Sequence, residues 1–153
     1  MEIQKERDES VFCALEPRVR SCLEEFGFTA PTPPQRLAIP KVLSHRNVLV
    51  IAPTGSGKTE SAMLPILSEL TREREHEGIY ALYITPLRAL NRDMLKRMDR
   101  WAELLGIDIQ VRHGDTPASQ RRRQALKPPA VLITTPETVQ LLLTGTRLRE
   151  HMR

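Results

Sequence analysis

One stretch, residues 48–59, constrains the fold of this chain more than any other. It begins with five apolar residues, 48–52, which have the length of a buried strand, and continues into a turn that contains Gly55 and Gly57. Lys58 and Thr59 follow, and the sequence after them has helical periodicity. A strand, a glycine-containing loop and a helix in this order are the layout of a phosphate-binding P-loop.

The residue types in this stretch suit a triphosphate. Gly55 and Gly57 allow the backbone to curl so that successive N–H groups face phosphate oxygens. Lys58 supplies a positive charge for the terminal phosphates, and the hydroxyl of Thr59 can coordinate Mg2+. The following helix adds the positive end of its dipole. The alternative is an ordinary glycine–serine turn between a strand and a helix. The strand pattern before the turn and the helical pattern after it favour the P-loop over this alternative.

Length and composition indicate a globular protein. The chain has 153 residues, of which 40% are hydrophobic and 27% charged, and this predicts one domain with a sizeable core. No apolar run approaches the length of a membrane span, and the charged N-terminus has no signal core, so we predict a cytoplasmic protein without a membrane partner. Residues 1–10 are expected to form a loose arm. Cys13 and Cys22 fit no zinc pattern and are expected to be free thiols.

The positive charge is concentrated toward the C-terminus. The formal net charge is +4, and from Pro117 onward seven basic residues stand against two acids, Glu137 and Glu150. The basic residues are Arg121, Arg122, Arg123, Lys127, Arg147, Arg149 and Arg153. Such a basic third suits an anionic partner such as nucleic acid, although a solvated helix face would look the same.

Hydrophobic periodicity predicts an alternation of helices and strands. Strands are expected at 48–52, 79–85, 107–111 and 130–134, and each is followed by a helical pattern. Helices are expected at about 16–25, 33–43, 58–75, 87–105, 116–126 and 137–143, with Gly27 and Gly145 as stops. The alternation predicts an α/β fold with a parallel, doubly wound sheet, in which strand ends on one edge carry the ligand site.

Five short motifs, taken in order, resemble those of superfamily-2 helicases. They are Pro-Thr-Pro-Pro-Gln at 31–35, Ala-Pro-Thr-Gly-Ser-Gly-Lys-Thr-Glu at 52–60, Thr-Pro-Leu-Arg-Ala-Leu at 85–90, Arg-His-Gly-Asp-Thr-Pro at 112–117 and Thr-Pro-Glu at 135–137. These correspond to the Q motif, motifs I and Ia, a glycine-containing element and motif Ib. The sequences of these motifs are most similar to those of the large helicase-related, or Lhr-type, group. The resemblance implies a P-loop NTPase with a RecA-like parallel sheet, helices on both faces, and residues 11–153 forming the N-terminal portion of the first RecA-like domain.

The resemblance also implies a nucleotide site. In such a site Gln35 contacts the adenine edge, to which an amide offers both a donor and an acceptor. The motif I residues that would hold ATP are Thr54, Gly55, Ser56, Gly57, Lys58, Thr59 and Glu60, with Lys58 and Thr59 serving catalysis and Thr59 binding Mg2+. Phe12 lies near the position of an adenine-stacking aromatic in relatives, but packing in the core is the stronger interpretation.

Nucleic acid is the second partner that the resemblance implies, with DNA favoured over RNA. The residues expected along the phosphate backbone are Pro86, Arg88, Gly114, Thr135, Pro136 and Glu137. Pro86 and Pro136 also suit simple helix initiation, and both interpretations can hold. Arg121, Arg122 and Arg123 either border the nucleic-acid track or form a solvated face. His113 is expected to be structural or solvated.

The sequence has no Asp-Glu-x-His after motif Ib, and the rest of a helicase motor is missing from these 153 residues. The resemblance therefore implies an ATP-binding fragment of an ATP-dependent helicase or translocase that hydrolyses little ATP alone. The alternative is a non-enzymatic nucleotide- or nucleic-acid-binding remnant or a subunit of a split protein. A sheet that is incomplete at the C-terminus predicts an exposed edge, a rearranged strand order or self-association.

Overall fold

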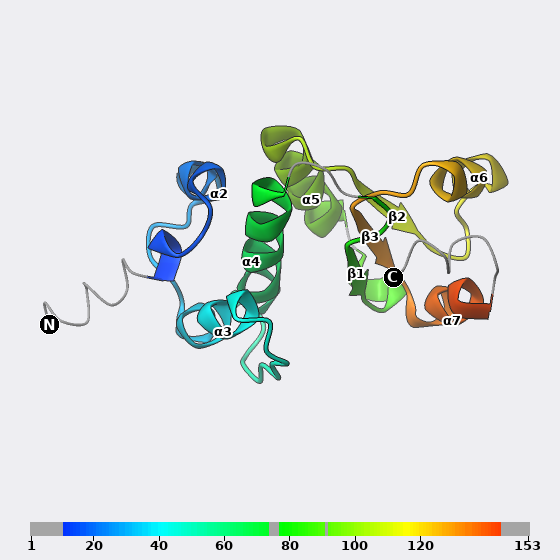
Figure 1. The fold of residues 1–153 in the computed structure, drawn as a ribbon. Coiled ribbons are helices and arrows are strands. Elements are labelled where there is room, and N and C mark those ends of the chain that lie inside the picture. Colours follow the sequence, from blue (N-terminus) through cyan, green and yellow to red (C-terminus); the bar gives the residue numbers. More distant parts are fainter. Residues whose placement is uncertain (1–10, 74–76, 91, 145–153) are drawn as a thin grey trace, which may run out of the picture. The chain divides into compact units, whose positions relative to one another are not determined.

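The computed structural model describes residues 11–73, 77–90 and 92–144 (Figure 1). Its internal contacts divide the chain into two compact units, Met1–Arg74 and Glu75–Arg153, and each unit is described separately below. The predicted N-terminal arm and the predicted helix stop at Gly145 lie outside the described residues. The assignment of residues 11–153 to one portion of a RecA-like domain stays a prediction.

Unit 1 is built from helices. They are α2 (Pro17–Cys22), the 3-10 helix η1 (Glu24–Phe26), α3 (Pro33–Leu43) and α4 (Lys58–Arg72). The helix predicted over 16–25 is therefore shorter, because its last turn tightens into η1 before Gly27 ends it with a φ of 74°. The predicted bounds of α3 are confirmed, and the proline at its first position suits a residue without an N–H.

The core of unit 1 lies between α2, α3 and α4. Val19, Ile39 and Leu64 have no exposed surface, and Pro65 is also fully buried within α4. The backbone N–H of Glu16 donates to Ser68 Oγ at 2.5 Å and so fixes the start of α2 against α4. Phe12 is 8% exposed, so it packs in this core, as the sequence favoured.

The strand predicted over 48–52 is wrong for the described structure. This segment is extended but joins no sheet, and Leu49 and Ile51 are 85% and 88% exposed, while Val48, Val50 and Ala52 are half-buried. No backbone-to-backbone hydrogen bond involves residues 48–51 in the described part of the chain. A strand needs a neighbour to pair its N–H and C=O groups, and none of the described residues lies in pairing register with this segment.

Unit 2 contains a parallel three-stranded sheet in the order β1-β3-β2. The strands are β1 (Ala81–Ile84), β2 (Ile109–Arg112) and β3 (Val131–Thr134), and all three fall within or beside the predicted segments. In register, Ala81 and Ile109 both pair with Val131, and Ile84 and Arg112 both pair with Thr134. The sheet has three strands rather than the four expected, because residues 48–52 take no part in it.

Helices flank this sheet. They are η2 (Leu87–Ala89), α5 (Arg92–Leu105), α6 (Ala118–Leu126) and α7 (Pro136–Thr144). Figure 1 shows α5 on one side of the sheet and α6 and α7 on the other. Leu142 of α7 packs with Leu132 of β3 in one cluster, and on α5 the buried stripe includes Met94, Met98 and Trp101. Leu87, predicted to begin that stripe, is 55% exposed in η2.

The mixed α/β architecture with a parallel sheet and flanking helices is the predicted fold class. In the described part of the chain β1 and β2 are the outer strands of this sheet, and the expected consequence of an incomplete sheet stays a prediction. In that part, no helix is long and apolar enough to cross a membrane. The cytoplasmic location stays a prediction.

Candidate nucleotide-binding loop and strand-end loops

The loop before α4 has the backbone conformation that the P-loop prediction requires. Gly55 and Gly57 have φ values of 75° and 84°, in the left-handed region that side chains disfavour. Gly57 is also the N-cap residue of α4, and no side chain of a described residue caps the first turn. A helix of 15 residues thus begins without a side-chain cap at a turn that can accept an anion.

Gln35 and the P-loop lie next to each other. Gln35 is 1% exposed, its Oε1 accepts a 2.9 Å hydrogen bond from the backbone N–H of Thr32, and its Nε2 has no partner among the described residues. A Cβ placed on Gly57 would lie 2.5 Å from this Nε2. The Q-motif glutamine therefore contacts motif I directly, and the amide group leaves its donor unused beside the loop.

Lys58 contacts the loop's own backbone. Its Nζ donates to the carbonyl oxygens of Ala52 at 2.6 Å and Pro53 at 2.5 Å, and Ser56 Oγ donates to Pro53 O at 2.7 Å. These three bonds close the turn between the extended segment and α4. They hold the ammonium group at the backbone of the loop itself.

The remaining predicted motif I residues differ in exposure. Thr54 is exposed, Thr59 is half-buried in the first turn of α4, and Glu60 is buried at 7% exposure. In the described residues no group of three or more His, Cys, Asp or Glu side chains could hold a metal. The hydroxyl of Thr59 suits Mg2+ only as one ligand, and a nucleotide phosphate with water would supply the others, as is usual for this ion.

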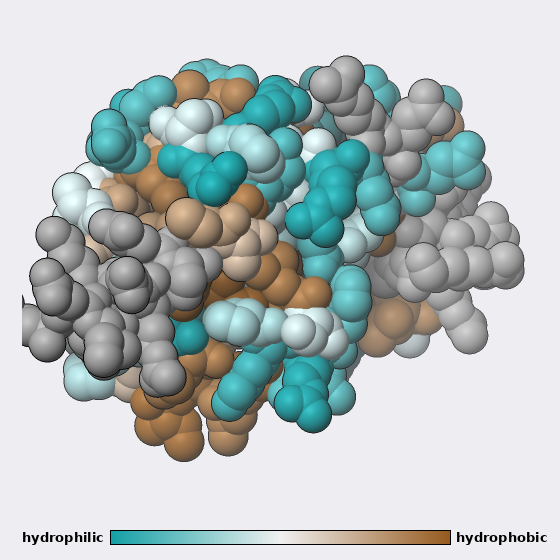
Figure 2. Space-filling view, turned by 60° about the vertical axis from the view of Figure 1, so that its left-hand side comes forward, coloured by the Kyte–Doolittle hydropathy of each residue, from teal (hydrophilic) through white to brown (hydrophobic). Residues whose placement is uncertain are grey.

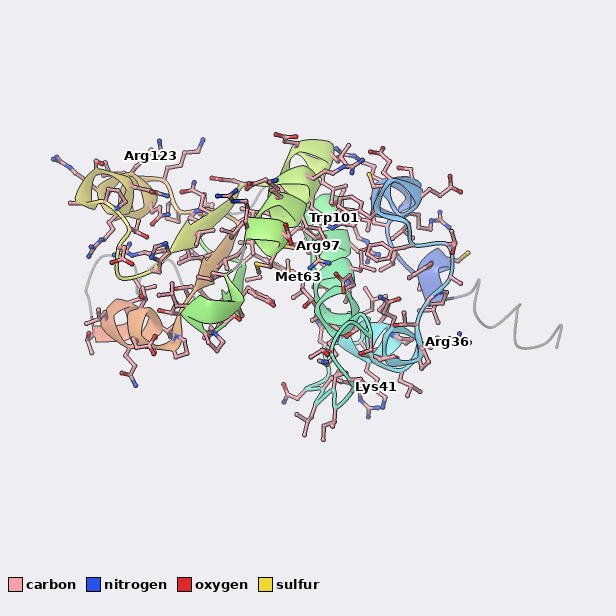
Figure 3. All side chains as sticks on the ribbon, turned by 180° about the vertical axis from the view of Figure 1, so that it is seen from behind. Arg36, Lys41, Met63, Arg97, Trp101 and Arg123 are labelled. Carbon is pink, nitrogen blue, oxygen red and sulfur yellow. The ribbon has the colours of Figure 1, made fainter. Side chains whose placement is uncertain are left out.

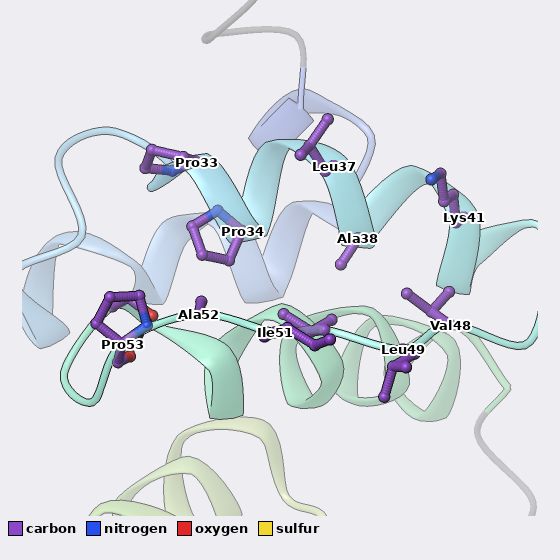
Figure 4. Close-up of a pocket in the computed structure, with 12 residues that line it drawn as sticks. Pro33, Pro34, Leu37, Ala38, Lys41, Val48, Leu49, Ile51, Ala52 and Pro53 are labelled. Atoms are coloured by element: carbon purple, nitrogen blue, oxygen red, sulfur yellow. Dashed lines mark hydrogen bonds between the residues drawn. The ribbon is translucent and has the colours of Figure 1, made fainter.

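An apolar groove of about 440 Å³ runs along the extended segment of unit 1. Its walls are the outer side of α3, with Pro34, Leu37 and Lys41, and residues 48–53 (Figure 4). Leu37 is 69% exposed. Figure 2 shows hydrophobic atoms at the surface along the bottom of the view, where the loop after α3 lies. The groove is next to the P-loop because Pro53 and Ser56 line its end.

In unit 2 the predicted strand ends share one edge of the sheet. Because β1, β3 and β2 are parallel and in register, their carboxyl ends at Ile84, Thr134 and Arg112 are neighbours. Pro86 follows β1 and is the N-cap of η2, which contains the backbone of Arg88. The structure therefore brings together the three loops that the sequence assigned to nucleic acid.

The loop after β3 is a tight strand-to-helix turn. Thr135 is 4% exposed, and its Oγ1 lies 3.0 Å from Oγ1 of Thr138 in the first turn of α7. Pro136 is the first residue of α7 and Glu137 is exposed in its first turn, so the helix-initiation role predicted for Pro136 is confirmed. Their roles at nucleic acid stay predictions.

Sequence reasoning gave no role to Arg112 and Gln124, and left Arg121 undecided. Gln124 is fully buried in α6, and its Nε2 donates to Val111 O of β2 at 3.0 Å. Arg121 Nε donates to Thr116 O at 2.6 Å and its Nη2 to Gly114 O at 3.1 Å. By contrast, Arg123 projects from α6 into solvent (Figure 3).

Arg112 lies at the end of β2, where burial and the charge of nearby Arg121 lower the pKa of its guanidinium. Its Nε and Nη1 are buried without a hydrogen-bond partner among the described residues. A lone arginine in a six-residue motif gives no sequence signal for such an environment. Only the register of β2 against β3 and the position of α6 create it.

A P-loop in contact with a Q-motif glutamine, together with loops at one edge of a parallel sheet, defines a RecA-like helicase fold. The sequence profile of the DEAD/DEAH box helicase family matches residues 32–153, and the chain belongs to this family. It is 39% identical to the ATP-dependent helicase Lhr-Core of Sulfolobus acidocaldarius over 95% of this chain and 18% of that protein. The chain thus spans about a fifth of the length of this curated relative.

Solved structures agree with this assignment. The helicase Lhr of Mycobacterium smegmatis, bound to single-stranded DNA and AMP-PNP, is similar at a TM-score of 0.74 and 40% identity, over 90% of this chain and 19% of that one. The DUF1998 helicase MrfA bound to DNA and AMPPNP is similar at a TM-score of 0.72 and 26% identity, over 84% of this chain and 18% of that one. The resemblance to superfamily-2, Lhr-type helicases is therefore confirmed.

Proposed function

We propose that this chain is the ATP-binding part of an ATP-dependent helicase motor that moves on single-stranded DNA. The observation that carries the proposal is the contact between Gln35 and Gly57, which joins the Q motif and the P-loop in one site. The family match and the similarity to helicases bound to DNA and an ATP analogue support it. A second candidate, a non-enzymatic binding remnant or a subunit of a split protein, uses the same residues.

In this proposal the P-loop backbone and the first turn of α4 hold the phosphates of ATP. Lys58 exchanges its bonds with Ala52 and Pro53 for phosphate oxygens, and Thr59 supplies one oxygen to Mg2+. The free Nε2 of Gln35 donates to an acceptor on the adenine edge, while Oε1 keeps the amide oriented through Thr32. Mg2+ supplies charge neutralisation of the phosphates when it is bound.

For nucleic acid, we propose that the three strand-end loops of unit 2 hold the phosphate backbone of one strand. The residues are Pro86, Arg88, Gly114, Thr135, Pro136 and Glu137, as predicted above. The N-terminus of α7 follows Thr135 directly and so offers N–H groups as phosphate donors. Contacts of this kind read no base sequence. DNA is proposed over RNA because Lhr and MrfA are similar structures bound to DNA.

We further propose that these 153 residues bind ATP but hydrolyse it very slowly. Phosphoryl transfer depends on a positioned water, a metal and a positive charge on the transferred group. The sequence supplies Lys58 and Thr59 but has no Asp-Glu-x-His to orient water. DNA-stimulated ATP turnover by the purified chain, lost on Lys58→Ala, would contradict this part of the proposal.

A second copy of this chain is proposed as a partner through residues 48–52. The segment is uncharged, extended and lacks backbone hydrogen bonds at 48–51 in the described structure. Antiparallel pairing centred on Val50 places Leu49 of one copy opposite Ile51 of the other and opposes no like charges. Strand addition of this kind uses an unpaired backbone as its template.

The binding proposal is tested with Lys58→Ala. We expect the wild-type chain to bind AMP-PNP with Mg2+ in calorimetry and Lys58→Ala to bind about tenfold to a hundredfold more weakly, the loss typical of hydrogen bonds to a charged group. Lys127→Ala removes the same charge from the C-cap residue of α6, in unit 2, and is the matched control. Equal affinity of Lys58→Ala and wild type for AMP-PNP would contradict the proposed nucleotide site.

A further inference from the structure

The loop between β2 and α6 is held closed by an arginine of the helix that follows it. We call residues 113–116 the clamped turn. Within it, Thr116 N donates to His113 O at 3.1 Å, and His113 N donates to Thr116 Oγ1 at 2.9 Å. From α6, Arg121 adds bonds to Thr116 O at 2.6 Å and to Gly114 O at 3.1 Å. One guanidinium therefore donates to two carbonyls of the turn, for which its rigid, planar set of N–H donors is well suited.

These bonds determine which groups the turn presents to solvent. Because Arg121 engages the carbonyls of Gly114 and Thr116, their negative ends do not face an approaching anion. The N–H of Gly114 makes no hydrogen bond in the described part of the chain, and Gly114 is exposed, with nothing within 4 Å of where a Cβ would lie. The backbone N–H of Asp115 donates to His113 Nδ1 at 3.3 Å, and the exposed carboxylate of Asp115 lies 3.8 Å from the same nitrogen.

A second guanidinium lies beside the clamped turn. Arg112 precedes it directly, and its Nε and Nη1 are buried and unpartnered among the described residues. Arg121 is bonded to Gly114 O and Thr116 O, so two guanidinium-bearing residues flank the turn, and the positive charge that they bring favours a phosphate there. The arrangement offers an unpaired backbone N–H, two positive charges and no facing carbonyl.

We propose that Arg121 is a positioning residue that holds the clamped turn so that Gly114 N–H and Arg112 can bind one phosphate of a single strand. This inference rests on the proposed binding of nucleic acid and adds the group that organises one of its loops. Arg121 acts through the turn's two carbonyls. Its neighbours Arg122 and Arg123 are exposed on α6 and act as general positive charge.

Charge and geometry can be separated by substitution. Arg121→Lys keeps the charge but cannot form the fork to two carbonyls, and Arg121→Gln removes both. Arg122→Gln removes one charge from the adjacent, exposed position and is the matched control. Binding of a fluorescent single-stranded DNA oligonucleotide is measured by anisotropy at several salt concentrations, with folding of each variant checked by circular dichroism.

We expect Arg121→Lys and Arg121→Gln both to bind about tenfold more weakly than wild type, as when one charge-assisted hydrogen bond is misplaced. Arg122→Gln should lose less than about threefold, since a single exposed charge contributes little. If Arg121→Lys binds like wild type, Arg121 acts by charge alone and the proposal fails. It also fails if Arg121→Gln lowers the slope of log affinity against log salt by about 0.7 while Arg121→Lys does not, because that marks a direct phosphate contact.

Hydrogen exchange separates the clamp from the DNA function. The amides of His113 and Thr116 are bonded inside the turn, and we expect both to lose protection in Arg121→Lys and Arg121→Gln but not in Arg122→Gln, without DNA present. Unchanged protection in the Arg121 variants would overturn the positioning role. A wild-type chain whose turn is protected but that binds no DNA would instead overturn the proposed nucleic-acid function and, with it, the phosphate.

Discussion

Two apolar segments of similar composition have opposite environments in this protein. Residues 48–52 are Val-Leu-Val-Ile-Ala, and β3, residues 131–134, is Val-Leu-Ile-Thr. All four residues of β3 have no exposed surface, because β3 is the central strand and helices lie on both sides of the sheet (Figure 1). In the first segment Leu49 and Ile51 are 85% and 88% exposed, and the backbone at 48–51 pairs with no described residue.

The difference shows that a short apolar run is not sufficient to form a strand. Both segments have β-branched residues and both precede a helix N-terminus. What distinguishes β3 is two neighbours in register, which satisfy its N–H and C=O groups, together with helices that cover the faces of the sheet, as Leu142 of α7 does at Leu132. Residues 48–52 instead line an open groove beside α3, and Lys58 bonds to the carbonyl of Ala52 at the end of the segment.

The largest expected effect contrasts one isoleucine from each segment. Ile133→Ala should lower the free energy of unfolding by about 2–5 kcal/mol, the range for a buried aliphatic residue replaced by alanine. Ile51→Ala should change it by less than about 0.5 kcal/mol, because the side chain is already in water. Urea denaturation at low protein concentration measures both.

Equal losses from the two isoleucine variants would mean that residues 48–52 are buried as a strand in solution. Val139→Ala offers a further control, since Val139 is half-buried on α7 and should lie between the two. Its intermediate loss would show that the assay resolves graded burial within the chain.

The second contrast uses the two glycines of the P-loop. Gly57→Ala places a Cβ 2.5 Å from Gln35 Nε2 in a left-handed conformation, whereas Gly55→Ala has the same conformational problem but open space. We expect Gly57→Ala to cost about 1–3 kcal/mol of unfolding free energy and Gly55→Ala only about 1 kcal/mol. The same denaturation assay applies, with AMP-PNP binding as a second readout.

A double variant isolates the contact between the Q motif and the P-loop. Removing the amide with Gln35→Ala should recover part of the loss caused by Gly57→Ala, so the two changes should not be additive. Strict additivity would indicate that Gln35 and Gly57 do not touch in solution. That result would also remove the observation on which the nucleotide proposal rests.

Much of this structure follows from the sequence, and the exceptions have a physical cause. The start of α3 was predictable because Thr32, Pro33 and Gln35 form a local signal. The ends of β1 at Ile84 and of β3 at Thr134 were predictable to within one residue because the apolar runs stop there. The local sequence pattern could not show that residues 48–52 lack a neighbouring strand, because strand pairing depends on the tertiary structure. It also could not show that Arg121 bonds to Gly114 and Thr116, because the partners of a long side chain depend on where the helix lies.

Replacing Leu49 and Ile51 together should have the smallest effect on stability and the most specific effect on self-association of the chain. The double variant Leu49→Ser, Ile51→Ser should leave the free energy of unfolding within about 0.5 kcal/mol of wild type, since both side chains are exposed. If a second copy pairs at residues 48–52, sedimentation velocity should show wild type associating as its concentration rises while the double variant stays monomeric. Leu126→Ser, at a residue 79% exposed on α6, is the matched control and should associate like wild type.

Equal association of all three proteins would place the contact between copies elsewhere on the chain. A wild type that is monomeric throughout would mean that an unpaired, uncharged backbone edge is insufficient for pairing at these concentrations.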